Sequence, residues 1–320
     1  MKNYNLCVVG AGNWGSNHIK TLKKLGSLGG VVDSNLVILS KIKKKYPNCL
    51  TFSSLDDSFK DKFDAYIVAT PPNTHYNIAN RIIDKKKPVL VEKPLTLNLD
   101  EAISLNNKAK KNKVNLMVGH LLLFHPAFRK IKQLIKDRMV GDIQYIYSNR
   151  LNLGSFRKDE NVLWSFAPHD ISLFNYFFED YPSSVTSNGV DILQKQVHDT
   201  SITSLKYSGN KMGHIFVSWL HPFKEHRFVI IGSKGMIHFE DAGESKPLIF
   251  YKKSVDLKNG FPVSRSKGSF EIEYSGDLPL TALLEYFLSN MHKNIKIANG
   301  DSAVEVMRVL DLATKSLSKN

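Results

Sequence analysis

Cysteine is scarce in this chain of 320 residues, which has only Cys7 and Cys49 and no Cys-x-x-Cys pair. This count excludes a disulfide framework, and the chain shows no zinc-ligand spacing. Both cysteines lie in strand-like apolar segments, which suits reduced thiols in the cytoplasm. We therefore expect a cytoplasmic protein without a metal site.

Long hydrophobic runs are also missing. No apolar stretch approaches the roughly 20 residues that a membrane span needs. The N-terminus leads directly into a strand-like segment, without the features of a signal peptide. Hydrophobic residues make up 42% of the chain, as in globular proteins, and the length suggests about two domains. We expect no insertion into a membrane.

Acidic residues are in deficit, with 30 Asp and Glu against 44 Lys and Arg and a net charge of +14. The lysine clusters lie near the ends of predicted helices, where cations suit the helix dipole and the solvent. No RNA-binding aromatic signature and no basic stripe interleaved with aromatics is present. We interpret the charge as a lysine-rich surface and expect no nucleic-acid partner, although a positive field could attract an anionic small substrate.

Glycine, by contrast, is concentrated near the N-terminus in a G-x-G-x-x-G stretch. It follows an apolar run at 4–9 and precedes a helix-like segment at 18–25, which is the setting of a dinucleotide-binding loop. In such a loop the first glycine allows a tight turn, the second lets a diphosphate approach, and the third packs the helix on the sheet. The predicted cofactor loop consists of Gly10, Gly12, Asn13, Trp14 and Gly15.

An acid follows at the expected distance. Asp33 ends a second short apolar run, 23 residues after Gly10. A carboxylate there accepts hydrogen bonds from the adenosine ribose, and the adjacent Ser34 and Asn35 offer no arginine for a 2′-phosphate. We therefore expect NAD as the cofactor. The alternative, a glycine-rich turn without a ligand, is outweighed by the position, the flanks and the acid together.

Strand-like and helix-like segments alternate up to about residue 120, which predicts an α/β fold with a doubly wound, parallel Rossmann sheet. Such sheets bind ligands beyond the carboxyl ends of their strands, where the unusual residues of this chain lie. Strands are expected at 4–9, 28–33, 64–69, 88–91 and 115–118. Helices are expected at 13–25, 35–46, 74–86 and 98–112.

The second part of the chain has a different pattern. Glycine-containing turns separate its strand-like segments, which indicates an α+β domain with a large, mostly antiparallel sheet. We expect residues 252–270 to form a long loop. The expected domains are therefore 1–120 and 121–320. Strands are expected at 142–151, 200–207, 211–219, 227–231 and 236–239, and helices at 126–138, 168–178, 279–292 and 301–317.

A second motif, Glu92-Lys93-Pro94, ends a buried strand where a cofactor and a substrate would meet. Partial burial and neighbouring charges can tune Lys93 for proton transfer, and Glu92 could hold its ammonium group. The tripeptide is common, and a surface lysine at a strand end is the alternative reading.

The order of the motifs is more specific. The glycine loop, Asp33, the segment 69–75 (Ala-Thr-Pro-Pro-Asn-Thr-His), Glu92-Lys93-Pro94 and Gly119-His120 together resemble the glucose–fructose oxidoreductase/inositol dehydrogenase (Gfo/Idh/MocA) family. The resemblance covers nearly the whole chain. It implies a bound nicotinamide cofactor, hydride transfer at a sugar or polyol carbinol, and homodimers or homotetramers built on the sheet of the second domain, which also binds the substrate.

The resemblance also implies individual residue roles. Lys93 and His169 become the catalytic candidates, and His169 matches the histidine of a D-x-x-x-H motif in which Ser165 replaces the aspartate. The implied cofactor contacts, besides the glycine loop and Asp33, are Thr70, Pro71, Asn73, His75, Glu92, Lys93 and His120. The candidate substrate contacts are Lys93, Arg150, Asn152, Arg157, Ser165 and His169, although solvation of a loop explains Arg150, Asn152 and Arg157 equally well.

Pro168 suits the first turn of a helix, which would place His169 near a helix N-terminus. The helix dipole would then keep its imidazole neutral and able to accept a proton. A capping or packed histidine is the alternative reading for this position.

Residues 149–154 and 159–171 resemble the branch of the family that acts on nucleotide-linked amino sugars. This implies oxidation of the C3 hydroxyl of UDP-N-acetylglucosamine to a 3-keto sugar, for later transamination in the synthesis of lipid A or another envelope glycan. Alternatives are a 3-dehydrogenase of UDP-N-acetylglucosaminuronic acid, or a reductase of another keto-sugar or polyol. A non-catalytic NAD-binding sensor is a further alternative, against which Lys93 and His169 argue.

Overall fold

The computed structural model describes residues 4–154, 156 and 160–318, which form two compact units. The first unit runs to Phe124 and also includes Leu278–Met307, and the second comprises His125–Asp277 and the chain from Arg308. We expected two domains that follow each other in the sequence, with a boundary at residue 120. The first unit instead also includes the later segment Leu278–Met307. Each unit is described by itself.

The first unit is a Rossmann fold, which confirms the expected α/β class. Its sheet has the strand order β3-β2-β1-β4-β5-β6, with every strand parallel to its neighbours. Two short elements, β3 and α3, were not expected. The strands are β1 Leu6–Val9, β2 Leu28–Val32, β3 Leu50–Phe52, β4 Ala65–Val68, β5 Val89–Val91 and β6 Leu116–Val118.

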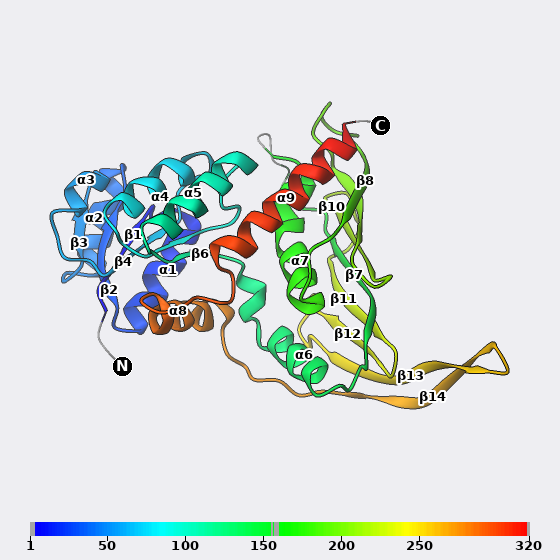
Figure 1. Ribbon diagram of the computed structural model, residues 1–320. Helices are drawn as coiled ribbons and strands as arrows, with labels where there is room; N and C mark the ends of the chain where they lie inside the picture. The colour runs from blue at the N-terminus through cyan, green and yellow to red at the C-terminus, as the bar shows by residue number, and fades with distance from the viewer. Residues whose placement is uncertain (1–3, 155, 157–159, 319–320) are drawn as a thin grey trace. The chain divides into compact units, whose positions relative to one another are not determined.

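Helices cover both faces of this sheet, with α1 beside α8 and α4 beside α5 (Figure 1). Asparagine side chains begin two of them, because Asn35 and Asn98 accept backbone N–H bonds at the starts of α2 and α5. The helices are α1 Asn13–Lys24, α2 Leu36–Lys45, α3 Leu55–Ser58, α4 His75–Asp84, α5 Leu99–Lys111 and α8 Pro279–Asn290, with short 3-10 turns at Pro72–Thr74 and Leu121–Phe124. Within the described residues, no helix is both long and apolar enough to cross a bilayer.

The second unit contains the expected large, mostly antiparallel sheet, in the order β14-β13-β12-β11-β7-β10-β9-β8. Among its strand pairs, β7 and β10 run parallel and the others antiparallel. The elements are α6 Pro126–Lys136, β7 Ile143–Leu151, α7 Val162–Phe178, β8 Ser184–Val190, β9 Thr200–Lys206, β10 Met212–Ser218, β11 Glu225–Gly232, β12 Met236–Glu240, β13 Leu248–Lys258 and β14 Phe261–Glu271. The last helix, α9 (Gly300–Leu317), contributes to both units.

Helix α7 begins six residues before the expected start at Pro168. Its N-cap is Asn161, whose side chain accepts the backbone N–H of Trp164, and Pro168 lies inside the helix. An interior proline costs about 3 kcal/mol, which burial of nearly the whole helix offsets here. The prediction that His169 lies at a helix N-terminus is therefore wrong. As the eighth residue, it lies beyond the first turn, to which the dipole effect is confined.

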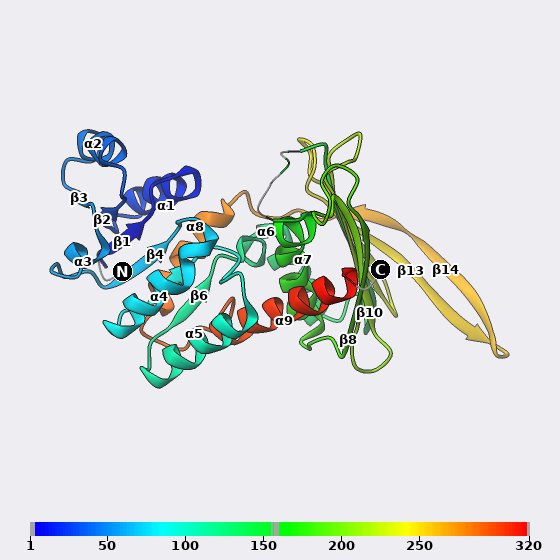
Figure 2. The ribbon, with the colours of Figure 1, turned by 90° about the horizontal axis from the view of Figure 1, so that it is seen from above.

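The expectation of a loop at residues 252–270 is also wrong. Strands β13 and β14 form a long two-stranded ribbon that extends from the sheet (Figure 2). Asn259 and Gly260 connect them, with φ angles of 50° and 80°. Positive values at both positions define the type I′ turn, which matches the twist of a hairpin.

Candidate functional site

The glycine loop lies where the connections of the Rossmann sheet diverge. Gly10 follows β1 and Ala69 follows the neighbouring β4, and the chain leaves these strands toward opposite ends of the sheet. Such a switch point is where doubly wound sheets bind ligands. Gly10 has a φ of 91°, and a Cβ there would lie 2.9 Å from the carbonyl group of Ala69. Only glycine fits this turn.

The other two glycines of the loop differ from each other. A Cβ on Gly15 would lie 1.9 Å from the carbonyl oxygen of Gly10, so glycine lets α1 pack against the turn. A Cβ on Gly12 would have no neighbour within 4 Å, so packing does not require glycine there. Gly12 is also the N-cap of α1 and has no side chain to cap it. Open space beside an uncapped helix start fits the diphosphate of NAD.

Asp33 holds this loop from the end of β2. Its Oδ2 accepts the backbone N–H of Ala11 at 2.7 Å, and its Oδ1 accepts that of Asn35 at 2.8 Å. Each carboxylate oxygen has a further lone pair, so both remain able to accept a ribose hydroxyl. Asn13 and Trp14 begin α1 with exposed side chains, and Trp14 is 48% exposed.

The segment after β4, residues 69–75, has exposed side chains and one buried histidine. Pro71 and Asn73 are exposed, and Thr70 is half-buried. His75 is buried, with Nδ1 2.8 Å from the carbonyl oxygen of Pro94 and Nε2 2.9 Å from that of Thr70. Burial lowers the pKa of His75, although these carbonyl groups oppose the shift. The ring of His75 therefore ties two loops together and faces protein atoms.

Glu92 and Lys93 follow β5, and a cis peptide bond joins Lys93 to Pro94. Glu92 Oε1 lies 2.6 Å from Nε2 of His18, and Oε2 accepts the backbone N–H of Lys93 at 3.2 Å. Burial works to raise the pKa of Glu92, but the bond to His18 and the charges of His18 and Lys93 hold it below its usual value. The carboxylate is therefore charged at neutral pH beside Lys93.

His18 was not among the expected site residues. It lies three residues after Gly15, which places it on the same buried face of α1. That position was the available signal, but its partner Glu92 is 74 residues away.

His120 follows β6 and is 2% exposed. Burial lowers its pKa to about 4; the charge of Lys93 adds to this effect and that of Glu92 opposes it. Its ring is therefore neutral at pH 7, and within the described residues neither ring nitrogen has a hydrogen-bond partner. A neutral imidazole at the carboxyl ends of the strands, with ring nitrogens able to form hydrogen bonds, could contact a polar ligand bound there.

In the second unit, Arg150 on β7 is paired with Asp170 on α7. Its Nε and one terminal nitrogen lie 2.9 and 3.1 Å from the two oxygens of Asp170, which is 1% exposed. Burial opposes the charge, but Asp170 raises the pKa of Arg150 above its usual value. The pairing, which was not expected, directs two of the five donors of Arg150 into the protein.

The remaining candidates of the second unit lie on α7 and after β7. Ser165 is buried and His169 half-buried, and their spacing of four residues places them on one face of α7. Asn152 is half-buried and follows β7, with its backbone N–H bonded to the carbonyl oxygen of Ser218. Arg157 lies outside the described residues. Lys93 and His169 belong to different units, so the structure describes each in its own surroundings.

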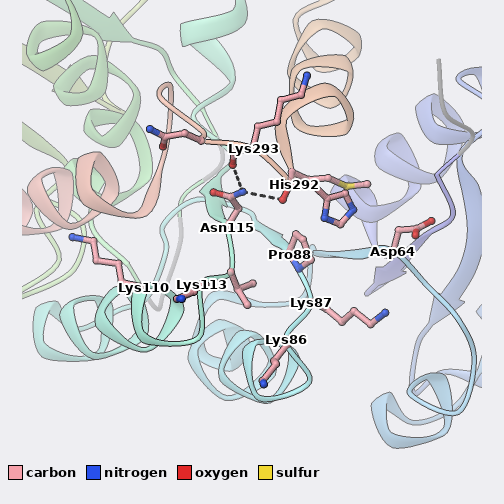
Figure 3. A pocket seen from close by; sticks show the side chains of 12 residues that line it. Asp64, Lys86, Lys87, Pro88, Lys110, Lys113, Asn115, His292 and Lys293 are labelled. Atoms are coloured by element: carbon pink, nitrogen blue, oxygen red, sulfur yellow. Dashed lines mark hydrogen bonds between the residues drawn. The ribbon is translucent and has the colours of Figure 1, made fainter.

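A cavity of about 570 Å³ lies at the amino ends of strands β4, β5 and β6 of the Rossmann sheet (Figure 3). It adjoins Pro88 and Asn115, which precede β5 and β6, and lysines from several loops line it. In Figure 3 the side chains of Lys86, Lys87 and Lys293 point in different directions. Since ligands of doubly wound sheets bind at the carboxyl ends of strands, this cavity is not part of the cofactor site.

Comparisons with known proteins agree with this geometry. A model described as "Oxidoreductase family, NAD-binding Rossmann fold" matches residues 4–120, and the "GFO/IDH/MocA C-terminal domain" matches residues 128–238. The 2,7-anhydro-N-acetylneuraminate hydratase of Escherichia coli (strain K12) is 23% identical over 85% of this chain and 84% of its own length.

Two comparisons involve enzymes of the same name from Acidithiobacillus ferrooxidans. Its UDP-N-acetylglucosamine 3-dehydrogenase is 28% identical over 57% of each chain. The solved structure of UDP-N-acetylglucosamine 3-dehydrogenase GnnA from this organism has a TM-score of 0.87 at 22% identity, over 100% of this chain and 99% of that one. With both domain models matched, the chain belongs to the Gfo/Idh/MocA family and is an NAD-dependent oxidoreductase acting on CH–OH groups.

Proposed function

We propose that this enzyme oxidises the C3 hydroxyl of a nucleotide-linked amino sugar, UDP-N-acetylglucosamine, to the 3-keto sugar. The product would serve later transamination in the synthesis of lipid A or another envelope glycan. The observation that carries the proposal is the position of Lys93, which is half-buried beside the charged Glu92 and follows a strand adjacent to the switch point. The 28% identity to a UDP-N-acetylglucosamine 3-dehydrogenase supports the substrate class.

In the proposed mechanism, the amine form of Lys93 takes the proton of the C3 hydroxyl group. When bound, NAD would supply the hydride acceptor for oxidation at C3. Gly12 and the start of α1 would hold its diphosphate, and Asp33 would accept its ribose hydroxyls. Glu92 stabilises the ammonium group that forms on Lys93, because a carboxylate close to a cation favours its charged form.

His169 is the second proton-transfer candidate in this proposal. Its support is the match to the family histidine and the placement of Ser165 on the same face of α7. The dipole argument for a neutral ring no longer applies. Ser165 cannot supply the charge of the missing aspartate, and Asp170 is occupied by Arg150. The two roles proposed for His169 are orientation of the sugar and participation in proton transfer.

The test is mass spectrometry of the products formed with NAD from a panel of nucleotide sugars. A 3-keto product from UDP-N-acetylglucosamine supports the proposal. Product only from UDP-N-acetylglucosaminuronic acid would move it to the related dehydrogenase, and NADH-dependent reduction of a keto-sugar or polyol would reverse its direction. Tight NAD binding without any turnover would indicate a sensor.

Two variants assign the chemistry. Lys93→Met should lower kcat by about 10²–10⁴-fold, the usual loss for a general acid–base group, while NAD binds as in the wild type. His169→Asn, which keeps a hydrogen-bonding side chain, should mainly raise the apparent KM for the sugar if His169 only orients it. Near-normal turnover in Lys93→Met would remove Lys93 from the mechanism.

A further inference from the structure

A buried polar pair joins the two parts of the candidate site in the first unit. His18 has no exposed side-chain area, and that of Glu92 is 14% exposed, with 2.6 Å between Nε2 and Oε1. Helix α1, which carries His18, starts at the loop that fits the diphosphate. Glu92 directly precedes Lys93. This contact therefore connects the cofactor loop to the proposed proton acceptor.

The carboxylate of Glu92 has little freedom. A Cβ on Gly119 would approach Oε2 to 2.9 Å, so the residue that follows β6 closes one side of the group. His18 holds Oε1, and Oε2 accepts the backbone N–H of Lys93. Short bonds to a charged carboxylate are among the stronger hydrogen bonds in proteins. Without His18, the buried carboxylate would favour its neutral form or turn away from Lys93.

We propose that His18 is a positioning residue, whose ring holds Glu92 so that its negative charge is presented to Lys93. The inference rests on the proposed role of Lys93 as proton acceptor. The titratable groups that act on Glu92 come from four segments: His18 from α1, His75 from α4, Lys93 from the same turn and His120 from the end of β6. His18 makes a direct side-chain bond to the carboxylate.

The test measures Lys93 without any sugar. The full-length protein is acetylated with trace acetic anhydride across a pH series, and peptide mass spectrometry gives the pH midpoint of labelling at Lys93. Glu92→Gln should lower this midpoint by about 1 unit or more, because the ammonium group loses a neighbouring negative charge. His18→Leu should shift it in the same direction. The double variant should shift no further than Glu92→Gln alone.

Two further variants separate positioning from general loosening of the helix. His18→Gln keeps an N–H donor at the reach of Nε2 and should restore the wild-type midpoint. Leu22→Ala removes a buried side chain one turn further along α1 and should lower the Tm without moving the midpoint. His18→Met replaces His18→Leu where the latter does not fold.

The proposal is overturned if His18→Leu leaves the midpoint unchanged while Glu92→Gln shifts it. It is equally overturned if His18→Leu has its full effect in the Glu92→Gln background, because His18 would then act independently of the carboxylate. Because the assay contains no sugar, a wrong substrate would fail only in the product assay and would leave these labelling results unaffected.

Discussion

Gly12 and Gly15 belong to one loop but are glycines for different reasons. Gly15→Ala brings Cβ against the backbone of Gly10, which cannot move aside, so we expect a loss of about 2 kcal/mol or more in the free energy of unfolding.

The new Cβ in Gly12→Ala would have no protein atom within 4 Å, so this variant should keep the wild-type Tm. Its affinity for NAD should fall at least about tenfold, because the methyl group would occupy the space proposed for the diphosphate. Calorimetry measures the stability of each variant, and titration measures its affinity for NAD. A wild-type affinity for NAD in Gly12→Ala would contradict the proposal that the diphosphate lies beside Gly12.

Asp33 should determine the choice of cofactor. Its carboxylate oxygens would accept the ribose hydroxyls of NAD and its charge would repel the additional phosphate of NADP, so NAD should bind more tightly. Asp33→Ala should narrow this difference in affinity mainly by weakening the binding of NAD, because the amides of Ala11 and Asn35 also lose their acceptor. Fluorescence titration of both cofactors measures the difference. Equal or tighter binding of NADP to the wild type would refute the prediction.

The glycine loop and its acid could be proposed as cofactor residues from the sequence because they are local signals with a fixed spacing. The role proposed for Lys93 came from its place at a strand end together with a resemblance, and that of His169 came from the resemblance; the experiments above test both. The contact between His18 and Glu92 and the bonds that Arg150 donates to Asp170 could not be predicted. Each joins residues that only the folded chain brings together, over 74 and 20 positions.

Among the elements, α7 and the ribbon show how local signals compete. We expected α7 to begin at Pro168 because proline favours a first turn. The helix begins instead after the Asn161 cap, and burial of the helix offsets the cost of the interior proline. In the ribbon, Asn259-Gly260 is a strong hairpin signal, but we predicted a loop over residues 252–270. Side chains on both faces of its outer part are exposed, so the sequence lacks the alternation that marks a half-buried strand.

The pair of Arg150 and Asp170 should hold α7 to β7. Asp170→Asn leaves a buried guanidinium group without its counter-charge, and we expect a loss of about 3–5 kcal/mol in the free energy of unfolding. The double change Arg150→Met with Asp170→Leu removes both charges and should cost less. Urea unfolding of the three proteins tests this. A double variant less stable than Asp170→Asn would show that the pair itself stabilises the fold.

At the scale of the whole molecule, the sheet of the second unit has a face directed away from α7. Strand alternation places half-buried aromatic and aliphatic side chains there, and the rings of Tyr147 and His214 stack at 5.2 Å. Contiguous apolar surface of this kind marks interaction sites. We propose that a second copy covers this face. Its residues include Tyr145, Tyr147, Met212, His214, Phe216, Val229, Ile231, Met236 and His238.

Sedimentation velocity tests this assembly. The wild type should sediment as a dimer or tetramer, and Phe216→Asp should shift it toward the monomer, because a charge on the covered face would be desolvated without a partner. Leu257→Asp makes the same kind of change on the ribbon, where the side chain is 75% exposed, and should leave the assembly intact. Dissociation by Leu257→Asp alone would assign the contact to the ribbon.

The alternation of strands and helices predicted both sheets, since the periodicity of each segment is a local property. It could not predict that residues 278–307 pack with the first unit. A helical pattern identifies a buried face but not the sheet that buries it. The bonds of Asn115 with the segment after α8 and the bridge from Met117 to Asn299 depend on this return of the chain.

This return has a consequence for synthesis on the ribosome. The backbone N–H of Val118, on edge strand β6, bonds to the carbonyl oxygen of Ala298, which is translated 180 residues later. At about 5–20 residues per second, that edge of the nascent Rossmann sheet waits roughly 9–36 s for its partner. The first part of the Rossmann unit is made before the second unit but is completed only with residues 278–307, so its open β6 edge is a part of the newborn chain that needs protection from other nascent chains.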